Sequence, residues 1–204
     1  RTLQVASVHH YRDQWAKAFD VKYEDESGEQ KYVHQTTYGM SERLLGATVA
    51  THGDDKGLIM PPSIAPIQVI IVPILSKEGS EEIMAAANEL TNALKSEKIR
   101  TKLDDRDIRP GQKYYDWEIK GVPLRIELGP RDLKSNSFMC ARRTGEKSSY
   151  SLDELIISVR KELKSVDTHM KQNSKYHFDN RIKQMPSLEI IDLHLSLDED
   201  LEDG

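Results

Sequence analysis

The sequence contains a single cysteine among its 204 residues, and this scarcity narrows the kinds of protein it can be. One cysteine, Cys140, cannot form an internal disulfide or a zinc site made of cysteines. It lies in the run SNSFMCARR (135–143), which predicts a strand, so we expect a small, buried apolar side chain. Folds held together by disulfides or by zinc–thiolate clusters are therefore excluded.

Long apolar runs are also absent. The longest, such as VIIVPIL (69–75), are far too short to span a bilayer, and no signal-peptide pattern opens the chain. Hydrophobic residues make up 37% of the chain and charged residues 31%, which is ordinary for a soluble globular protein. We therefore expect a cytoplasmic protein with no membrane partner. The chain begins without a methionine and ends in DEDLEDG (198–204), so we also expect a fragment of a longer protein.

The chain also lacks an excess of positive charge. The net charge of −5 argues against nonspecific binding of nucleic acids, because attraction to phosphates needs a basic surface. Any contact with RNA must therefore be local. The basic residues that could make such a contact are Arg106, Arg109, Lys113, Lys120, Arg125, Arg131, Lys134, Arg142 and Arg143.

The first 60 residues predict the end of a domain. Their patterns predict a strand at 2–7, a helix through YRDQWAKAFDV (11–21), a hairpin turn at 26–28, a strand at 31–37 and a helix at 41–51. The adjacent histidines His9 and His10 would then lie at the start of the first helix. The stretch GDDKGLIMPPSIAP (53–66) has no periodicity and is rich in glycine and proline, which is typical of a linker.

From residue 67 the pattern changes to that of an α/β domain. The run IQVIIVPI (67–74) is continuously apolar, as expected of a strand covered on both faces. This order of elements predicts a mixed sheet flanked by helices. The elements predicted after that strand are helices at 80–98 and 112–121, strands at 99–105, 123–129 and 135–143, and a last helical region at 151–184.

The segment YYDWEIKGVPLRIELGPRDL (114–133) carries the strongest functional signal. Its central strand alternates apolar residues with Arg125 and Glu127, so one face is apolar and the other charged. A Gly-Pro turn then places Arg131 and Asp132 beyond the strand. A fixed carboxylate can accept the imino and amino protons of guanine, while arginine offers a planar fork of donors. The segment therefore indicates recognition of unpaired bases.

Three motifs together resemble the prolyl-tRNA synthetase family, of the archaeal and eukaryotic-like type. They are HQTTYGMSERLLG (34–46), GDDKGLIMPPSIAPIQVIIVPI (53–74) and the segment at 114–133. The resemblance extends from residue 1 to about residue 185.

The resemblance implies three domains. Residues 1–62 would be the C-terminal part of a class II catalytic domain, built on an antiparallel sheet and including motif 3. Residues 63–165 would form the α/β anticodon-binding domain, with a mixed sheet flanked by helices. Residues 166–204 would begin a C-terminal extension that is truncated or degenerate.

The resemblance also implies a pocket for ATP and proline in the first domain. A glycine lets the backbone approach a ligand closely, and an arginine can stack on adenine while neutralising phosphate. A metal site at His9 and His10 is disfavoured, because no cysteine completes a zinc-binding set. The implied ATP contacts are Gln4, Ser7, Ser41 and Arg43, and the implied proline pocket contains His9, Gln35 and Tyr38, the last in place of the family's frequent tryptophan.

In the second domain, the resemblance implies that Glu118, Arg131 and Asp132 face the two guanines shared by all proline anticodons. Arg125 would support them. Trp117 is expected in the core, although stacking on a base is the alternative. The run Asp104–Asp107 invites a metal site, but a charged loop with internal ion pairs is expected, with positioning of RNA as the alternative.

The family implies an enzyme that activates proline with ATP and Mg²⁺ and transfers it to tRNA(Pro), as a homodimer. No metal site is expected within this chain. Motifs 1 and 2 of class II synthetases are absent from it, so the fragment alone is expected to be inactive. Two rivals remain: a noncatalytic accessory or RNA-binding protein with a synthetase-type anticodon domain, and another class II synthetase. Retention of His9, Ser41 and Arg43 argues against the first, and the motif at 114–133 favours proline.

Overall fold

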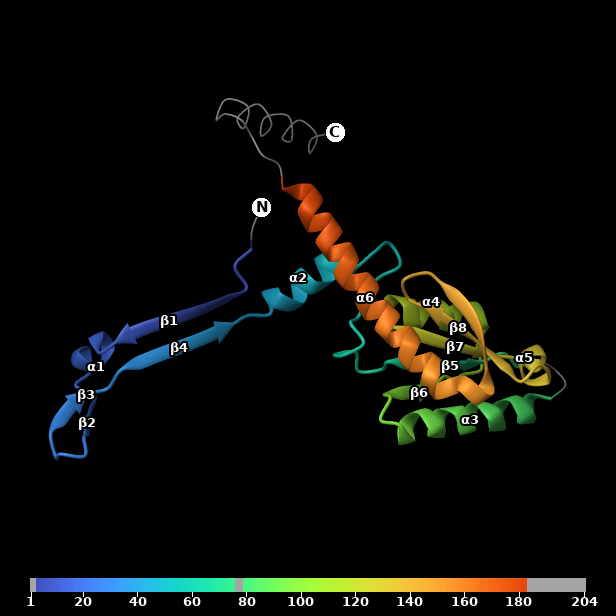
Figure 1. Cartoon of the computed structure of the whole chain (residues 1–204), viewed down its shortest axis with the longest axis horizontal. Helices are drawn as coiled ribbons and strands as arrows, with labels where there is room; N and C mark the ends of the chain where they lie inside the picture. The colour runs from blue at the N-terminus through green and yellow to red at the C-terminus, as the bar shows by residue number, and fades with distance from the viewer. Residues whose placement is uncertain (1–2, 76–78, 183–204) are drawn as a thin grey trace, which may run out of the picture. The chain divides into compact units, whose positions relative to one another are not determined.

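A computed structural model describes residues 3–75 and 79–182 (Figure 1). The described residues divide into two compact units. The first comprises residues 3–59 together with Glu118–Gly121, and the second comprises residues 60–75, 79–117 and 122–182.

The first unit is organised around an antiparallel ribbon of two strands, β1 (Ala6–Arg12) and β4 (Gln35–Met40). A short helix, α1 (Gln14–Ala18), and a hairpin of β2 (Lys22–Glu24) and β3 (Gln30–Tyr32) connect them. The predicted hairpin turn is confirmed between β2 and β3. Helix α2 (Arg43–His52) follows β4.

Two predictions for this unit are wrong. His9 and His10 lie within strand β1 and not at the start of a helix, because β1 pairs with β4, where His9 stands opposite Thr37 and His10 opposite Thr36. This pairing joins segments almost 30 residues apart, so the local pattern does not reveal it. The predicted helix at 11–21 shrinks to the five residues of α1.

The second unit contains a mixed sheet of five strands in the order β6-β5-β7-β8-β9. The central strand β5 (Val69–Pro73) is parallel to β6 (Thr101–Leu103) and to β7 (Leu124–Leu128). Strands β8 (Ser137–Arg142) and β9 (Lys147–Ser151) extend the sheet in antiparallel fashion. The predicted mixed sheet is confirmed, but β9 is an addition to the strands that the sequence predicted.

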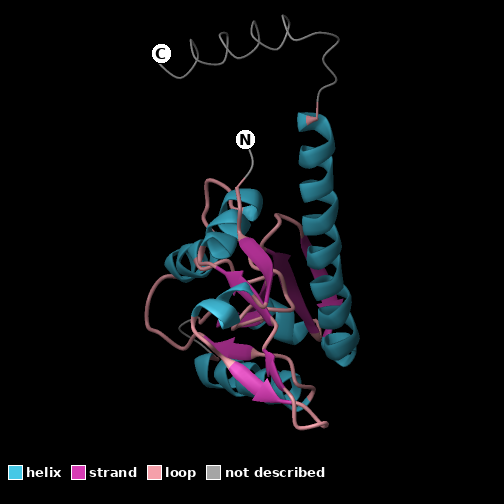
Figure 2. Cartoon of the chain, turned by 90° about the vertical axis from the view of Figure 1, so that its left-hand side faces the viewer, coloured by secondary structure: helices cyan, strands magenta, loops and turns pink. Residues whose placement is uncertain are grey.

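Helices cover both faces of this sheet (Figures 1 and 2). Helix α4 (Pro110–Ile119) packs Trp117 against Ile70 and Val72 on one face. Helix α6 (Leu155–Arg181) lies on the opposite face, where its Glu162 contacts strands β8 and β9. Helix α3 (Ser80–Ser96) contacts α6, β5 and β6, and the short helix α5 (Pro130–Lys134) follows β7.

The core of the second unit lies between these layers. Every residue of β5 and β7 is buried, as the continuous apolar run in β5 predicted. Cys140 of β8 is also buried, and burial raises the pKa of its thiol to about 12, which confirms the expected small apolar side chain. In β7 the predicted alternation is present, but the charged face is also buried, with Arg125 and Glu127 each 8% exposed.

Helix α6 runs without a break across residue 165, where the sequence placed a domain boundary. Residues 171–181 of this helix are exposed apart from the half-buried Ser174. The rest of the predicted extension, residues 183–204, lies outside the described residues. Within residues 3–75 and 79–182, no helix is both long enough and apolar enough to cross a membrane.

Candidate functional sites

A cluster of charged and aromatic side chains lies on the α4 side of the sheet. Glu127 of β7 accepts a hydrogen bond from Arg125 Nε at 3.0 Å and one from Lys147 Nζ of β9 at 3.1 Å, both on Oε1. The Arg125 guanidinium also lies over the ring of Tyr114 from α4, 3.8 Å from the ring centroid. We call Tyr114, Arg125, Glu127 and Lys147 the β7 cluster. It joins three elements around one buried carboxylate.

The β7 cluster is assembled by the sheet's own alternation and register. Arg125 and Glu127 are two residues apart in β7 and therefore point to the same face. Ala141 of β8 pairs with both Arg125 and Lys147, so Lys147 comes to that face as well. Lys147 is 52% exposed in its side chain, which leaves the edge of the cluster open to solvent.

A network of hydrogen bonds holds helix α4, which carries Tyr114, to the loop that contains Asp104. Trp117 Nε1 donates to the buried Asp104 Oδ2 at 2.7 Å, and Lys113 Nζ donates to the Asp104 carbonyl at 3.0 Å. Arg106 bonds both Asp104 oxygens, at 2.8 and 2.7 Å, and its other nitrogen bonds Asp116 at 2.8 Å. The expected internal ion pairing of this loop and the core position of Trp117 are both confirmed.

The environment also sets the protonation states of these groups. Burial alone would raise the pKa of Asp104, but hydrogen bonds from Arg106 and Trp117 outweigh it and lower the pKa to about 2. Tyr114 shows the opposite shift, because burial and the negative charge of Glu127 raise its pKa to about 12. At neutral pH, Asp104 is therefore ionised and the Tyr114 hydroxyl remains a donor.

Beyond β7 the chain forms helix α5 where the sequence predicted a turn. Asp132 lies in its first turn and accepts a hydrogen bond from the Gly129 backbone N–H at 2.8 Å, which caps the helix and fixes the carboxylate. Arg131 is exposed at its surface. The negative charge of Asp132 also contributes to the raised pKa of Tyr114. The hydrogen bond from Gly129 places the Asp132 carboxylate at the end of β7.

The four predicted anticodon residues thus fall into distinct settings. Arg125 lies against Tyr114 and Asp132 at the end of β7, while Arg131 is exposed on α5. Glu118 is half-buried near the end of α4, four residues after Tyr114, so the two side chains lie on the same side of that helix. Alternation in the sequence placed Glu127 on the charged face of β7 but gave it no role, and it did not single out Tyr114 or Lys147. Lys147 required the unpredicted β9.

The face that carries the β7 cluster continues over β8 and β9. Met139 stands opposite Glu127 in β8 and is half-buried, and its partner Ser149 in β9 is exposed. The surface beside the cluster is therefore accessible. Cations, a carboxylate and an aromatic ring thus lie beside an accessible surface, a combination of groups that can contact an unpaired base.

In the first unit, the register of the ribbon places the residues predicted to bind ATP and proline on two different faces. Ser7 stands opposite Gly39 and His9 opposite Thr37, so these residues share one face. Tyr38 stands opposite Val8 and belongs to the other face. The ribbon therefore does not bring His9 and Tyr38 together on one side.

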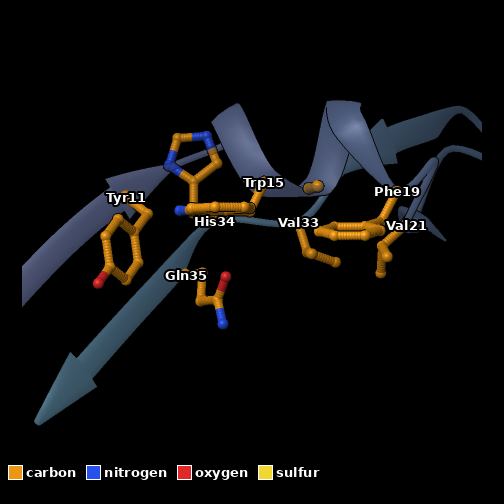
Figure 3. A pocket seen from close by; sticks show the side chains of 8 residues that line it. Tyr11, Trp15, Phe19, Val21, Val33, His34 and Gln35 are labelled. Atoms are coloured by element: carbon orange, nitrogen blue, oxygen red, sulfur yellow. The ribbon is translucent and has the colours of Figure 1, made fainter.

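The other predicted residues of this pocket lie around the ends of the ribbon. Gln4 precedes β1, Ser41 follows β4, and Arg43 begins α2, and all three are exposed. Gln35 lines a hollow of about 510 Å³ beside α1 (Figure 3). Most of this hollow is aromatic or aliphatic: its other lining residues are Tyr11, Trp15, Ala16, Phe19, Val21, Val33 and His34.

Aromatic contacts form one wall of the hollow. Trp15 meets Tyr11 edge-to-face at 6.1 Å and stacks with Phe19 at 6.0 Å, yet Trp15 is 50% exposed and Phe19 71%. A group of three or more histidine, cysteine, aspartate or glutamate side chains that could hold a metal is absent among residues 3–75 and 79–182.

Comparisons with known proteins show which family this chain resembles. Residues 68–162 match the family model for the anticodon binding domain. The chain is 50% identical over 190 residues to a proline–tRNA ligase of Thermococcus kodakarensis, an alignment that covers 93% of this chain and 40% of the relative. It is 49% identical over 183 residues to that of Methanosarcina mazei, covering 89% of this chain and 38% of the relative.

A third relative, the proline–tRNA ligase of Methanoregula boonei, is 53% identical over 152 residues, which cover 74% of this chain and 32% of the relative. The chain thus spans about 40% of the length of the curated relatives it matches. With this identity over most of its length, it corresponds to the C-terminal portion of prolyl-tRNA synthetases and contains an anticodon-binding domain.

Proposed function

We propose that the second unit binds the anticodon loop of tRNA(Pro) on the face that carries the β7 cluster, as part of an enzyme that attaches proline to this tRNA. The observation that carries the proposal is the cluster itself. It holds Arg125 against Tyr114 and Glu127, with Lys147 beside them and the fixed carboxylate of Asp132 nearby.

These groups suit guanine better than the other bases. Guanine presents two acceptors, O6 and N7, on one edge, and an arginine fork can donate to both. Its opposite edge presents N–H groups, which a carboxylate such as Asp132 or Glu118 can accept. Because the carboxylate of Asp132 is held by the Gly129 N–H, its direction is set before RNA arrives. We expect the two guanines of the proline anticodon to occupy this surface, with Arg131 contacting the same loop.

The acidic net charge of the chain supports specific contacts over general attraction to phosphate. A net charge of −5 supplies little long-range pull on RNA, so affinity must come from a few local contacts. The pairing of Arg125 and Lys147 with Glu127 also reduces the positive potential of the cluster. Binding should therefore depend strongly on base identity.

For the first unit, we propose a share of the pocket for ATP and proline in a longer, homodimeric enzyme. Ser7 and His9 occupy one face of the ribbon, and Gly39, the cross-strand partner of Ser7, has no side chain to hinder a ligand's approach to the backbone. Arg43 begins α2 and is exposed, so its guanidinium can reach a nucleotide. With Gln4, Gln35, Tyr38 and Ser41, these are the residues we assign to ATP and proline.

The binding proposal is tested with RNA hairpins that carry the proline anticodon arm. The 204-residue chain should bind the hairpin with both guanines at least about tenfold more tightly than hairpins in which either guanine is replaced by adenine, since one base-edge contact discriminates by about 1–3 kcal/mol. Equal binding of all hairpins would contradict the proposal. Discrimination without any aminoacylation by the longer protein would favour the rival, a noncatalytic RNA-binding protein.

A further inference from the structure

Glu127 occupies an unusual place in the β7 cluster. It is an acidic residue, 8% exposed, in the middle of a surface proposed to bind a polyanion. Its Oε1 lies 3.0 Å from Arg125 Nε, 3.0 Å from the Arg125 terminal nitrogen and 3.1 Å from Lys147 Nζ. One carboxylate oxygen therefore holds two cations that come from different strands.

The geometry points to Glu127 as a positioning residue for base recognition: its carboxylate fixes Arg125 and Lys147 relative to one another, so that guanine meets a preformed pair of donors. This inference rests on the proposed anticodon binding. It assigns Glu127 no contact with RNA, and its role is exerted through the two cations.

Without the carboxylate, the two cations would not stay in place. Both lie within 3.1 Å of one oxygen, so their nitrogens are at most about 6 Å apart, and like charges at that distance repel each other. Lys147 carries a long, flexible side chain that is half exposed, and it would move towards solvent. Arg125 would keep its contact with Tyr114 but lose the hydrogen bond that sets the rotation of its guanidinium plane.

This role can be separated from a simple electrostatic one, because the two predict opposite changes in RNA affinity when the charge of Glu127 is removed. If Glu127 only lowers the positive potential, removing its charge should strengthen binding of every RNA, whatever its sequence. If Glu127 positions Arg125 and Lys147, removing its charge should weaken binding of the hairpin with guanines and reduce discrimination. The variant Glu127→Gln tests this because it keeps the shape and removes the charge.

The control is Glu97→Gln. Glu97 is an exposed carboxylate that follows α3 and pairs with Arg160 of α6, outside the β7 cluster, and its substitution changes the net charge by the same amount. A second variant, Glu127→Asp, keeps the charge but shortens the side chain by one methylene group, so the carboxylate cannot reach both cations as before. A purely electrostatic role predicts no loss of discrimination in Glu127→Asp.

The measurement is binding of labelled hairpins to the 204-residue chain, with the proline anticodon arm and with each guanine replaced by adenine. Thermal unfolding of each variant verifies the fold. We expect Glu127→Gln to lose about tenfold in discrimination, Glu127→Asp to lose a smaller part of it, and Glu97→Gln to retain it all.

Retained discrimination in both Glu127 variants, or tighter binding of every hairpin by Glu127→Gln, would overturn the inference while leaving the proposed function intact. If Glu127→Gln does not fold, the result with Glu127→Asp decides. Failure of the unsubstituted chain to discriminate would instead overturn the proposed function, and with it the inference.

Discussion

The two units differ in the burial and pairing of their polar side chains. In the second unit, Asp104, Arg125 and Glu127 are buried and held by two or more hydrogen bonds or ion pairs from within the same unit. In the first, only Ala16 is buried among residues 3–59, and the residues proposed to bind ATP and proline are exposed or half-buried. The buried side chains of the proposed anticodon site in the second unit are therefore held in place within that unit, whereas those of the proposed ATP and proline pocket in the first unit are largely open to solvent.

This difference in burial arises from the number of layers of secondary structure in each unit. A two-stranded ribbon cannot bury both of its faces, and it is marginally stable by itself. A five-stranded sheet covered by helices on both faces can bury a charged cluster and pair every member of it. Side chains fixed in this way can recognise a base with little loss of conformational entropy.

The largest effect expected from this comparison concerns catalysis. The 204-residue chain should show no measurable proline-dependent exchange of pyrophosphate into ATP, because the exposed residues of the first unit do not enclose a reacting phosphate. The assay is isotope exchange with the purified chain. Robust exchange would show that the first unit holds a complete site for ATP and proline. The two units would then not differ in how well their sites are formed.

Stability should differ almost as strongly between the units. Ile71→Ala in the core strand β5 should lower the free energy of unfolding by about 2–5 kcal/mol, because it removes a fully buried side chain. Val8→Ala in β1, where the side chain is 67% exposed, should change it by no more than about 0.5 kcal/mol. Urea unfolding of both variants and of the unsubstituted chain measures these changes in the free energy of unfolding. Similar losses would mean that the ribbon is packed as tightly as the sheet.

The Asp104 network gives a smaller and pH-dependent effect. Its folded-state pKa of about 2 lies below the ordinary value of 3.8, so the stabilisation is present above about pH 4 and is lost as the pH falls towards 2. Asp104→Asn should cost about 1–3 kcal/mol at pH 7 by weakening the bonds from Arg106 and Trp117.

Unfolding at low pH can be followed by the fluorescence of Trp117 in a Trp15→Phe background. In Asp104→Asn, the pH dependence of stability between about pH 4 and 2 should become shallower. An unchanged slope would show that Asp104 is not the group responsible.

The elements that the sequence predicted well are those whose pattern is local. The apolar run of β5 and the spacing of Ile83, Ala87, Leu90 and Leu94 in α3 need no knowledge of distant partners, because burial alone imposes them. Strand β9 is different. Its sequence KSSYS is polar, and it becomes a strand because it pairs with β8 across a tight turn at Gly145, where φ is 108°.

The same reasoning explains what was missed in the sites. Arg125 and Asp132 could be found because they lie in one continuous motif. Lys147 reaches Glu127 from a strand 20 residues further along, and the division of His9 and Tyr38 between two faces depends on the register of β1 with β4. Register is set by pairing between distant segments, so a single sequence does not reveal it.

The most direct test of the account compares four proteins against the same set of hairpins: the unsubstituted chain, Glu118→Ala, Arg131→Ala and Lys134→Ala. If Glu118 and Arg131 contact the anticodon guanines as proposed, Glu118→Ala and Arg131→Ala should lose discrimination worth about 1–3 kcal/mol. Lys134→Ala should weaken all hairpins about equally and lower the salt dependence, as expected of a phosphate contact. Equal sensitivity of all four proteins to the guanine substitutions would contradict the assignment of these residues to the anticodon.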